Sequence, residues 1–311
     1  MVMHLLAIHM KRVLVVGAGI LGLVTAVREH LDGNQVFILE KRKRIGGRGT
    51  SEESHGHQLE FGPHLLLKGG ELHSMVKKVS RIKPSLRPLR ANKIFIVGHG
   101  MLQPLNNPKQ MLQVKLGQDP IRDAAARLIS GWGQEIPERR TALMKGKLCV
   151  VGEGWAGLIG RLASTLEEVG VPIQTGMNIV EQFEGGVMTS EGLKIEADEV
   201  KMCNGDPKGE SVKVSTLDLV LDNIPLKGLH GLIKDDVAII DLAAIHSRKA
   251  PGMSHLSCIS LTGGIKAIED LLDERVSGWR SHIITKRTNE SITLTDSRGL
   301  LSDGIISKTV S

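Results

Sequence analysis

A glycine-rich turn between an apolar run and a helical stretch constrains this chain more than any other feature. Residues 12–16 form a short β-branched run, which is followed by Gly17-Ala18-Gly19-Ile20-Leu21-Gly22 and a helix-like stretch to about Glu29. A second apolar run, residues 36–39, ends on Glu40, eighteen residues beyond Gly22. This order predicts a strand, a tight turn, a helix and a second parallel strand, which together make the βαβ unit of dinucleotide-binding folds.

Each glycine of this turn has its own expected role. Gly17 allows the tight turn, Gly19 lets the backbone approach a pyrophosphate, and Gly22 permits close packing of the helix on the strand. The helix N-terminus offers backbone N–H groups and a positive potential to the phosphates. Glu40 is placed to accept hydrogen bonds from the adenosine ribose, and its charge disfavours the 2′-phosphate of NADP. The alternative is an ordinary glycine-rich turn without a ligand.

The segment after Glu40 indicates which dinucleotide the chain binds. An acid that ends the second strand, followed by Gly46-Gly47-Arg48 and a nearby Thr50, resembles the extended FAD fingerprint of the flavin amine oxidase, phytoene desaturase and protoporphyrinogen oxidase superfamily. NAD dehydrogenases do not usually carry this extension. Two glycines let the chain run close to a cofactor, and Arg48 can offer a planar fork of donors to the pyrophosphate or the flavin edge. The basic residues 41–44 are interpreted as a solvated turn with Lys41 near the adenosine, and a nucleic-acid patch is the alternative.

The resemblance extends to the segment Leu59-Glu60-Phe61-Gly62-Pro63-His64. It implies that Gly62 and Pro63 lie against the isoalloxazine ring, with His64 near its reactive face as the one catalytic candidate. An ordinary loop histidine is the alternative for His64.

Two later segments are assigned by the same resemblance. In one, residues 152–157 precede a helix, a strand and a β-meander, and the backbone of Val180 meets the adenine. Read as a second dinucleotide fingerprint, residues 152–157 would need an acid-terminated strand after them, and none follows. In the other, residues 299–304, Asp303 binds the ribityl chain, although Ser302 stands where the family has a glycine.

The expected fold is α/β, with a Rossmann-like FAD-binding domain and a second, reduced α+β substrate domain. In the middle of the chain, the residue pattern predicts a hairpin over residues 93–102 and short helices over 108–127. The pattern of residues 264–279 predicts one helix. The substrate region is short for this superfamily, and Met10 looks like the more natural start. The expected division of the chain is an extension (1–9), a first FAD-binding part (10–67), a reduced substrate or cap region (68–147), a second FAD-binding part (148–205), the sheet and helix of the substrate domain (206–289) and a C-terminal FAD-binding strand (290–311).

Composition narrows the ligand classes. Three Trp, four Phe and no Tyr make an aromatic cage for an amine improbable, which favours an apolar, isoprenoid- or carotenoid-like substrate. The net charge of +6 is spread along the chain, so nucleic acid is not an expected partner. Cys149, Cys203 and Cys258 lie too far apart for a zinc site or a disulfide framework, and no metal site is expected. Because no cysteine follows Cys258, the flavin is expected to be non-covalent.

These observations predict an FAD-dependent oxidoreductase that moves a hydride from an apolar substrate to flavin N5. A flavin-binding structural or regulatory subunit without turnover is the first alternative, and an NAD-dependent dehydrogenase is the second. The longest apolar run is too short to span a membrane. A cytoplasmic location is therefore expected, with peripheral membrane contact left open.

Overall fold

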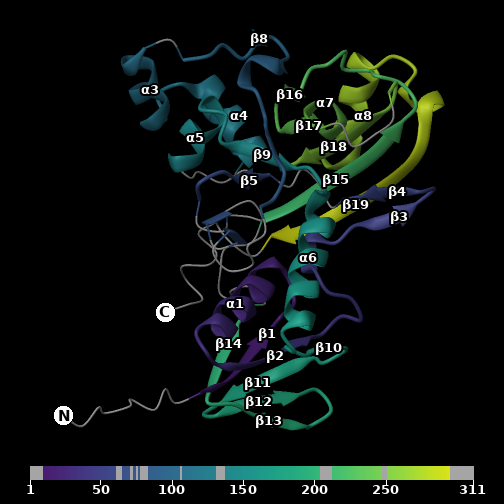
Figure 1. The fold of residues 1–311 in the computed structure, drawn as a ribbon. Coiled ribbons are helices and arrows are strands. Elements are labelled where there is room, and N and C mark those ends of the chain that lie inside the picture. The colour runs from purple at the N-terminus through teal and green to yellow at the C-terminus, as the bar shows by residue number, and fades with distance from the viewer. Residues whose placement is uncertain are drawn as a thin grey trace.

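A computed structural model of the protein describes residues 10–60, 65–70, 73–74, 76–77, 83–105, 107–130, 137–203, 212–246 and 251–294. Figure 1 shows a small sheet with its helices at one end of the molecule and a larger sheet at the other, where the long strands β15 and β19 cross toward the smaller sheet. Among the described residues, no helix is long and apolar enough to cross a membrane.

The smaller sheet is parallel and contains the predicted βαβ unit. Its strands stand in the order β10-β2-β1-β14. Their bounds are Arg12–Val16 for β1, Gln35–Glu40 for β2, Ile173–Thr175 for β10 and Glu199–Met202 for β14. Helix α1, Ile20–Leu31, connects β1 to β2 and ends two residues beyond the expected Glu29. The predicted order of strand, glycine turn, helix and second parallel strand is confirmed.

Alternate residues of β1 serve two different cores, as expected for a strand buried on both faces. Val13 and Val15 pack with α1 and with helix α6, Gly154–Glu168. Leu14 and Val16 pack with an antiparallel meander on the other face of the sheet. The meander consists of β11, Ile179–Phe183, β12, Gly186–Thr189, and β13, Lys194–Glu196. The expected helix and meander after residues 152–157 are therefore confirmed.

The larger sheet has seven strands in the order β19-β15-β18-β17-β16-β7-β8. The bounds are Ile94–Ile96 for β7, Gly100–Met101 for β8, Val212–Leu221 for β15, Gly231–Lys234 for β16, Val237–Asp241 for β17, Ser254–Ser260 for β18 and Ile283–Leu294 for β19. Strands β7 and β8 form the predicted antiparallel hairpin. The last five residues of β19, 290–294, pair within this sheet, while the rest of the segment expected to form a C-terminal cofactor-binding strand lies outside the described residues.

Helices cover both faces of the larger sheet. On one face lies α8, Gly264–Arg275, with its own apolar cluster. On the other face lie α4, Pro120–Ser130, and α5, Pro137–Met144, while α3, Pro108–Lys115, contacts α5. The short helices predicted over residues 108–127 are confirmed, and α5 is an addition to that prediction.

Three short strands connect the two ends of the molecule. Strand β9, Leu148–Val151, pairs antiparallel with β5, Leu66–Leu67, and with β6, Leu86–Pro88. A separate hairpin consists of β3, Glu52–Ser54, and β4, His57–Leu59.

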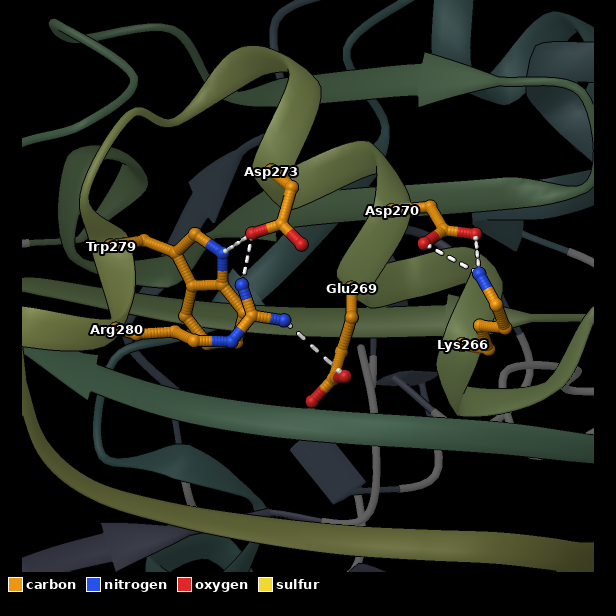
Figure 2. Close-up of polar contacts among 6 residues, drawn as sticks. All are labelled: Lys266, Glu269, Asp270, Asp273, Trp279 and Arg280. Atoms are coloured by element: carbon orange, nitrogen blue, oxygen red, sulfur yellow. Dashed lines mark hydrogen bonds and ion pairs between the residues drawn. The ribbon is translucent and has the colours of Figure 1, made fainter.

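The single helix expected over residues 264–279 is wrong at its C-terminal end. Helix α8 stops at Arg275, Gly278 adopts a left-handed conformation with φ of 70°, and a short 3-10 turn follows at Trp279–His282. Trp279 folds back and is buried, with its indole Nε1 donating to Asp273 at 2.8 Å (Figure 2). Arg280 pairs with Asp273 and with Glu269 and stacks on the Trp279 ring. A tryptophan buried by a turn continues the apolar pattern of the helix, which explains the overextended prediction.

Candidate functional site

The first glycine turn has the geometry that its sequence predicts. Gly17 has φ of 106°, a conformation that favours glycine, and its N–H donates to Leu39 at 2.7 Å. A Cβ atom on Gly22 would lie 1.8 Å from the carbonyl oxygen of Gly17, so no larger residue fits there. The chain therefore passes from β1 into α1 by a turn that requires glycine at both ends.

The N-terminus of α1 is open to an anion. Gly19 is the N-cap residue, no side chain caps the helix, and the first turn carries no acidic residue. The nearest atom to a Cβ built on Gly19 is the Cα of Gly47, at 4.0 Å. The backbone N–H groups of this first turn, around Ile20 and Leu21, have no partner within the helix, and such groups are common ligands of phosphate.

The structure brings the second glycine segment against the first. Gly46 donates from its N–H to the carbonyl oxygen of Ala18 at 2.7 Å, and Gly46 and Gly19 form an isolated β-bridge. Gly46 and Gly47 both have positive φ, at 101° and 56°. The main chain of Arg48 lies in the 3-10 turn Gly47–Gly49, whereas its side chain is outside the described part of the structure. Two segments that are separated by β2 in the chain thus share one surface.

Glu40 faces the glycine turn from the end of β2. Its side chain is buried, one carboxylate oxygen accepts from the N–H of Ala18 at 2.8 Å, and the other accepts from the N–H of Arg42 at 2.9 Å. A carboxylate oxygen has two lone pairs, so both oxygens can accept further hydrogen bonds. The neighbouring Lys41 is exposed. Glu40 is therefore fixed in place with acceptor capacity left.

Helix α6 packs against the second glycine segment. A Cβ on Gly49 would lie 2.7 Å from the Cδ1 of Ile159, and Trp155 is fully buried beside it. The turn that starts α6 has a different role from the turn at Gly17, because its strand β9 is antiparallel to both neighbours. A Cβ on Gly152 would meet the imidazole of His246 at 2.3 Å, so this glycine serves packing. Residues 152–157 therefore do not form a second dinucleotide fingerprint, as expected.

The remaining predicted site residues are placed only in part. Val180 lies where the register of the β11–β12 pair shifts, and its side chain is 57% exposed. Shortly before Val180 in the chain, the N–H of Met177 donates to the backbone carbonyl of Glu40 at 2.9 Å. Gly62, Pro63, His64 and Asp303 lie outside the described residues.

The residue-by-residue prediction missed a buried polar cluster in the larger sheet. Asp218 of β15 accepts from the N–H of Glu60 at 2.6 Å, and the same oxygen lies 2.8 Å from Nε2 of His255 of β18. Asp218 and His255 are 1% and 2% exposed. Glu60 is the last described residue before the segment with Gly62, Pro63 and His64, and this cluster fixes the main chain at Glu60. The available signal was an acid between two leucines in β15 and a histidine in β18.

Asp241, at the end of β17, extends this cluster. Its Oδ1 accepts from the N–H groups of Ala243 and Ala244 at 3.0 and 3.1 Å, and from that of His255 at 3.5 Å. Burial raises the pKa of Asp241, although these hydrogen bonds act in the opposite direction. Among the described residues, Oδ1 of Asp218, Nδ1 of His255 and Oγ of Ser257 are buried without a hydrogen-bond partner.

Comparison with known sequences places the glycine turn in a family. Residues 15–79 match the NAD(P)-binding Rossmann-like domain. A phytoene desaturase of Fusarium fujikuroi is 46% identical over 57 residues, which are 18% of this chain and 10% of that enzyme. A lycopene-forming phytoene desaturase of Pantoea ananas is 27% identical over 142 residues, which are 45% of this chain and 28% of that enzyme. The aligned stretches thus span a small part of the length of these curated relatives.

Comparison with solved structures extends the likeness to most of the chain. A Pyrococcus furiosus protein has a TM-score of 0.68 at 17% identity, covering 89% of this chain and 88% of that one. Cyclohexylamine oxidase from Brevibacterium oxydans has a TM-score of 0.58 at 15% identity, covering 90% and 84%. A Rab GDI of Plasmodium falciparum has a TM-score of 0.62 at 14% identity, covering 92% and 90%. At these identities the likeness concerns the fold. The desaturase matches over the glycine turn and the fold shared with an amine oxidase support the resemblance to the FAD-dependent amine oxidase and phytoene desaturase superfamily.

Proposed function

We propose that this chain binds FAD non-covalently and acts as an FAD-dependent oxidoreductase. The observation that carries the proposal is the joint surface of the two glycine segments, with Gly46 bonded to Ala18 and Glu40 held beside them at an uncapped helix N-terminus. An anionic diphosphate fits this surface, because backbone N–H groups and the helix dipole favour negative charge there. The absence of an acid in the first turn of α1 supports the same ligand.

The residues around this surface receive distinct roles in the proposal. The backbone from Gly17 to Gly22 holds the diphosphate, and Glu40 accepts hydrogen bonds from the ribose hydroxyls. By family resemblance, Lys41 lies near the adenosine, Val180 offers its backbone to the adenine, Arg48 reaches the pyrophosphate or flavin edge and Asp303 binds the ribityl chain. Gly62, Pro63 and His64 are assigned to the isoalloxazine on the same basis.

The buried pair of Asp218 and His255 is proposed to position the flavin-facing segment. Asp218 holds the N–H of Glu60, and His255 fixes the carboxylate of Asp218 in turn. Because both side chains are almost fully buried, their geometry is rigid compared with that of a surface loop. These two residues act through Glu60 and are positioning residues in this account.

When bound, FAD supplies a hydride acceptor at N5, so that a substrate loses a hydride to the flavin and a proton to the medium. The proposed substrate is apolar and isoprenoid- or carotenoid-like. Support comes from the scarcity of aromatic side chains for an amine cage and from relatives that are named phytoene desaturases.

Three cysteines without a disulfide among the described residues are compatible with a cytoplasmic location.

The test is FAD affinity in a Glu40→Ala variant, measured by quenching of flavin fluorescence. Removing charge-assisted hydrogen bonds worth about 1.5–3 kcal/mol should weaken FAD binding roughly ten- to a hundredfold. Glu53→Ala is the matched control, because Glu53 is an exposed acid on β3, and it should leave the affinity unchanged. Equal FAD affinity in the wild type and the Glu40→Ala variant would refute the assigned role. A protein that takes up NADH in preference to FAD would favour a dehydrogenase instead.

A flavin-binding subunit without turnover is the second candidate, because a Rab GDI shares this fold and the fold alone does not determine activity. Anaerobic mixing of the FAD-loaded protein with a polyene such as phytoene separates the two candidates. Bleaching of the flavin absorption supports an oxidoreductase. A flavin that binds but stays oxidised with both polyene and amine substrates supports the subunit.

A further inference from the structure

A basic pocket lies away from the glycine turns, where β6, the 3-10 turn Ala91–Lys93, the start of β16 and the end of the short helix α7, Leu242–Ile245, come together. It encloses about 350 Å³. Its ionisable lining residues are all basic or histidine: Arg87, Arg90, Lys93, His230 and His246. The pocket shares no lining residue with the surface around Gly19 and Glu40.

Within the part of the chain that the structure describes, the three cations of this pocket have no counter-charge. Among the described residues, no carboxylate lines the pocket, and Arg87, Arg90 and Lys93 form no ion pair. Arg87 and Arg90 are exposed, and Lys93 is half-buried. Three like charges around one cavity repel one another, so this arrangement favours an anion that sits between them.

His230 adds a neutral donor to these charges. It is 4% exposed, and its Nδ1 accepts from the backbone N–H of Arg90 at 3.0 Å. Burial, together with the charges of Lys93 and Arg90, lowers the pKa of His230 from 6.5 to about 4. The ring is therefore neutral near pH 7, and because Nδ1 is an acceptor, the proton sits on Nε2. A neutral ring of this tautomer offers one N–H to a ligand in the pocket.

The rest of the wall is held by one main-chain and one side-chain contact. The N–H of His230 donates to the carbonyl of Lys93 at 2.8 Å, and Nε2 of His246 lies 3.2 Å from Oγ of Ser85. The basic side chains thus project from a framework that exists without a ligand, which reduces the entropic cost of binding.

We propose that this pocket binds a phosphate or diphosphate group, held by Arg87, Arg90 and Lys93. Arginine forks match the oxygens of a phosphate with two parallel hydrogen bonds, and lysine contributes a point charge. The group belongs either to a free ion or to the polar end of a larger ligand, and the chemistry of recognition is the same. This inference does not depend on the proposed oxidoreductase activity.

The test is calorimetric titration with inorganic pyrophosphate of protein preincubated with excess FAD, so that the glycine turn is not the site measured. The wild type should bind pyrophosphate, and Arg90→Gln should weaken the affinity about tenfold, the effect of losing one charged hydrogen-bonding partner. The main-chain N–H that Arg90 donates to His230 remains in this variant. Arg87→Gln, at an exposed position where folding tolerates the change, should weaken binding similarly. Lys115→Gln, on the exposed side of α3, is the control and should leave binding unchanged.

Two results would overturn the proposal. One is a wild type that does not bind pyrophosphate at millimolar concentration, and the other is equal affinity in the wild type, Arg87→Gln and Arg90→Gln proteins. A parallel titration with a long-chain alkyl diphosphate identifies the source of the group. Tighter binding of the alkyl compound than of pyrophosphate, lost in Arg90→Gln, assigns the pocket to the head of an amphiphilic ligand, and equal binding assigns it to a free ion.

Discussion

The two ends of the molecule hold their polar groups in opposite ways. At the small parallel sheet, backbone atoms are presented by the glycines of two short turns, as at Gly17, Gly19 and Gly46. At the seven-stranded sheet, buried side chains meet across strands that are far apart in sequence, as Asp218 and His255 do. The first site is limited by space for a Cβ atom, and the second by the cost of burying polar groups.

This difference determines which mutations each end tolerates. A glycine cradle loses function when a methyl group enters it, because the backbone atoms around it cannot yield easily. Removing one partner of a buried acid–histidine pair lowers the free energy of unfolding, because the other partner is left without a hydrogen bond in a low-dielectric interior. The following substitutions test that contrast in order of expected effect.

Asp218→Ala should cause the largest loss. It removes the partner of His255 and of the Glu60 N–H, and removing one member of a buried pair costs about 3–5 kcal/mol. Urea unfolding monitored by tryptophan fluorescence measures the change. The exposed Asp222, which pairs with His282, is the control, and Asp222→Ala should cost about 0–1 kcal/mol. Similar losses in both variants would remove the distinction between buried and surface pairs.

Gly22→Ala should destabilise the protein by about 3 kcal/mol, at the upper end for overpacking, because the new Cβ meets a backbone carbonyl that cannot yield easily. FAD affinity should fall in the same variant. Gly160→Ala in α6 is the matched control, since nothing lies within 4 Å of its Cβ position. Alanine inside a helix should raise stability there by up to about 1 kcal/mol. A Gly22→Ala protein as stable as the wild type would contradict this account, because it would show that the turn can accommodate a Cβ atom.

His230 should make stability depend on pH. Its pKa is lowered from 6.5 to about 4 by burial and by Lys93 and Arg90. Between pH 6.5 and pH 4, this histidine therefore binds a proton in the unfolded chain but stays neutral in the folded chain. The contribution of the neutral ring is complete above pH 6.5 and is lost as pH falls toward 4. The difference in unfolding free energy between the wild type and His230→Gln should therefore shrink by about 3 kcal/mol from pH 7 to pH 4. A pH-independent difference would contradict a buried, neutral His230.

Asp236→Ala should have the smallest effect, about 1 kcal/mol, as for the loss of a helix cap. One oxygen of Asp236 accepts from the N–H groups of Thr262 and Gly263 at 2.6 and 2.9 Å, at the start of α8. Burial alone would raise the pKa of Asp236, but the hydrogen bonds from Thr262 and Gly263 outweigh it and lower the pKa. The stabilisation is present above the ordinary pKa of 3.8 and is lost as pH falls through the lowered value. Thermal unfolding at pH 7 and at pH 3 checks both the size and the sign.

The same contrast explains how far the fold and the site could be predicted from sequence. The turn at Gly17, the acid at Glu40 and the segment at Gly46 were readable because each role is set by a local conformation and a short spacing. The end of α8 was not readable, because Trp279 continues the apolar pattern while a turn at Gly278 carries it back into the core. The pairing of Asp218 with His255 depends on a register between β15 and β18 that no local pattern specifies.

The account as a whole depends on FAD binding at the glycine turn. The most direct measurement is the near-ultraviolet and visible absorption spectrum of the purified protein, with the cofactor released by heat and identified. The account predicts flavin absorption bands with FAD in the released fraction, and loss of both in the Gly22→Ala protein. A colourless protein that also fails to take up added FAD would contradict the proposed cofactor, and the oxidoreductase assignment would be abandoned.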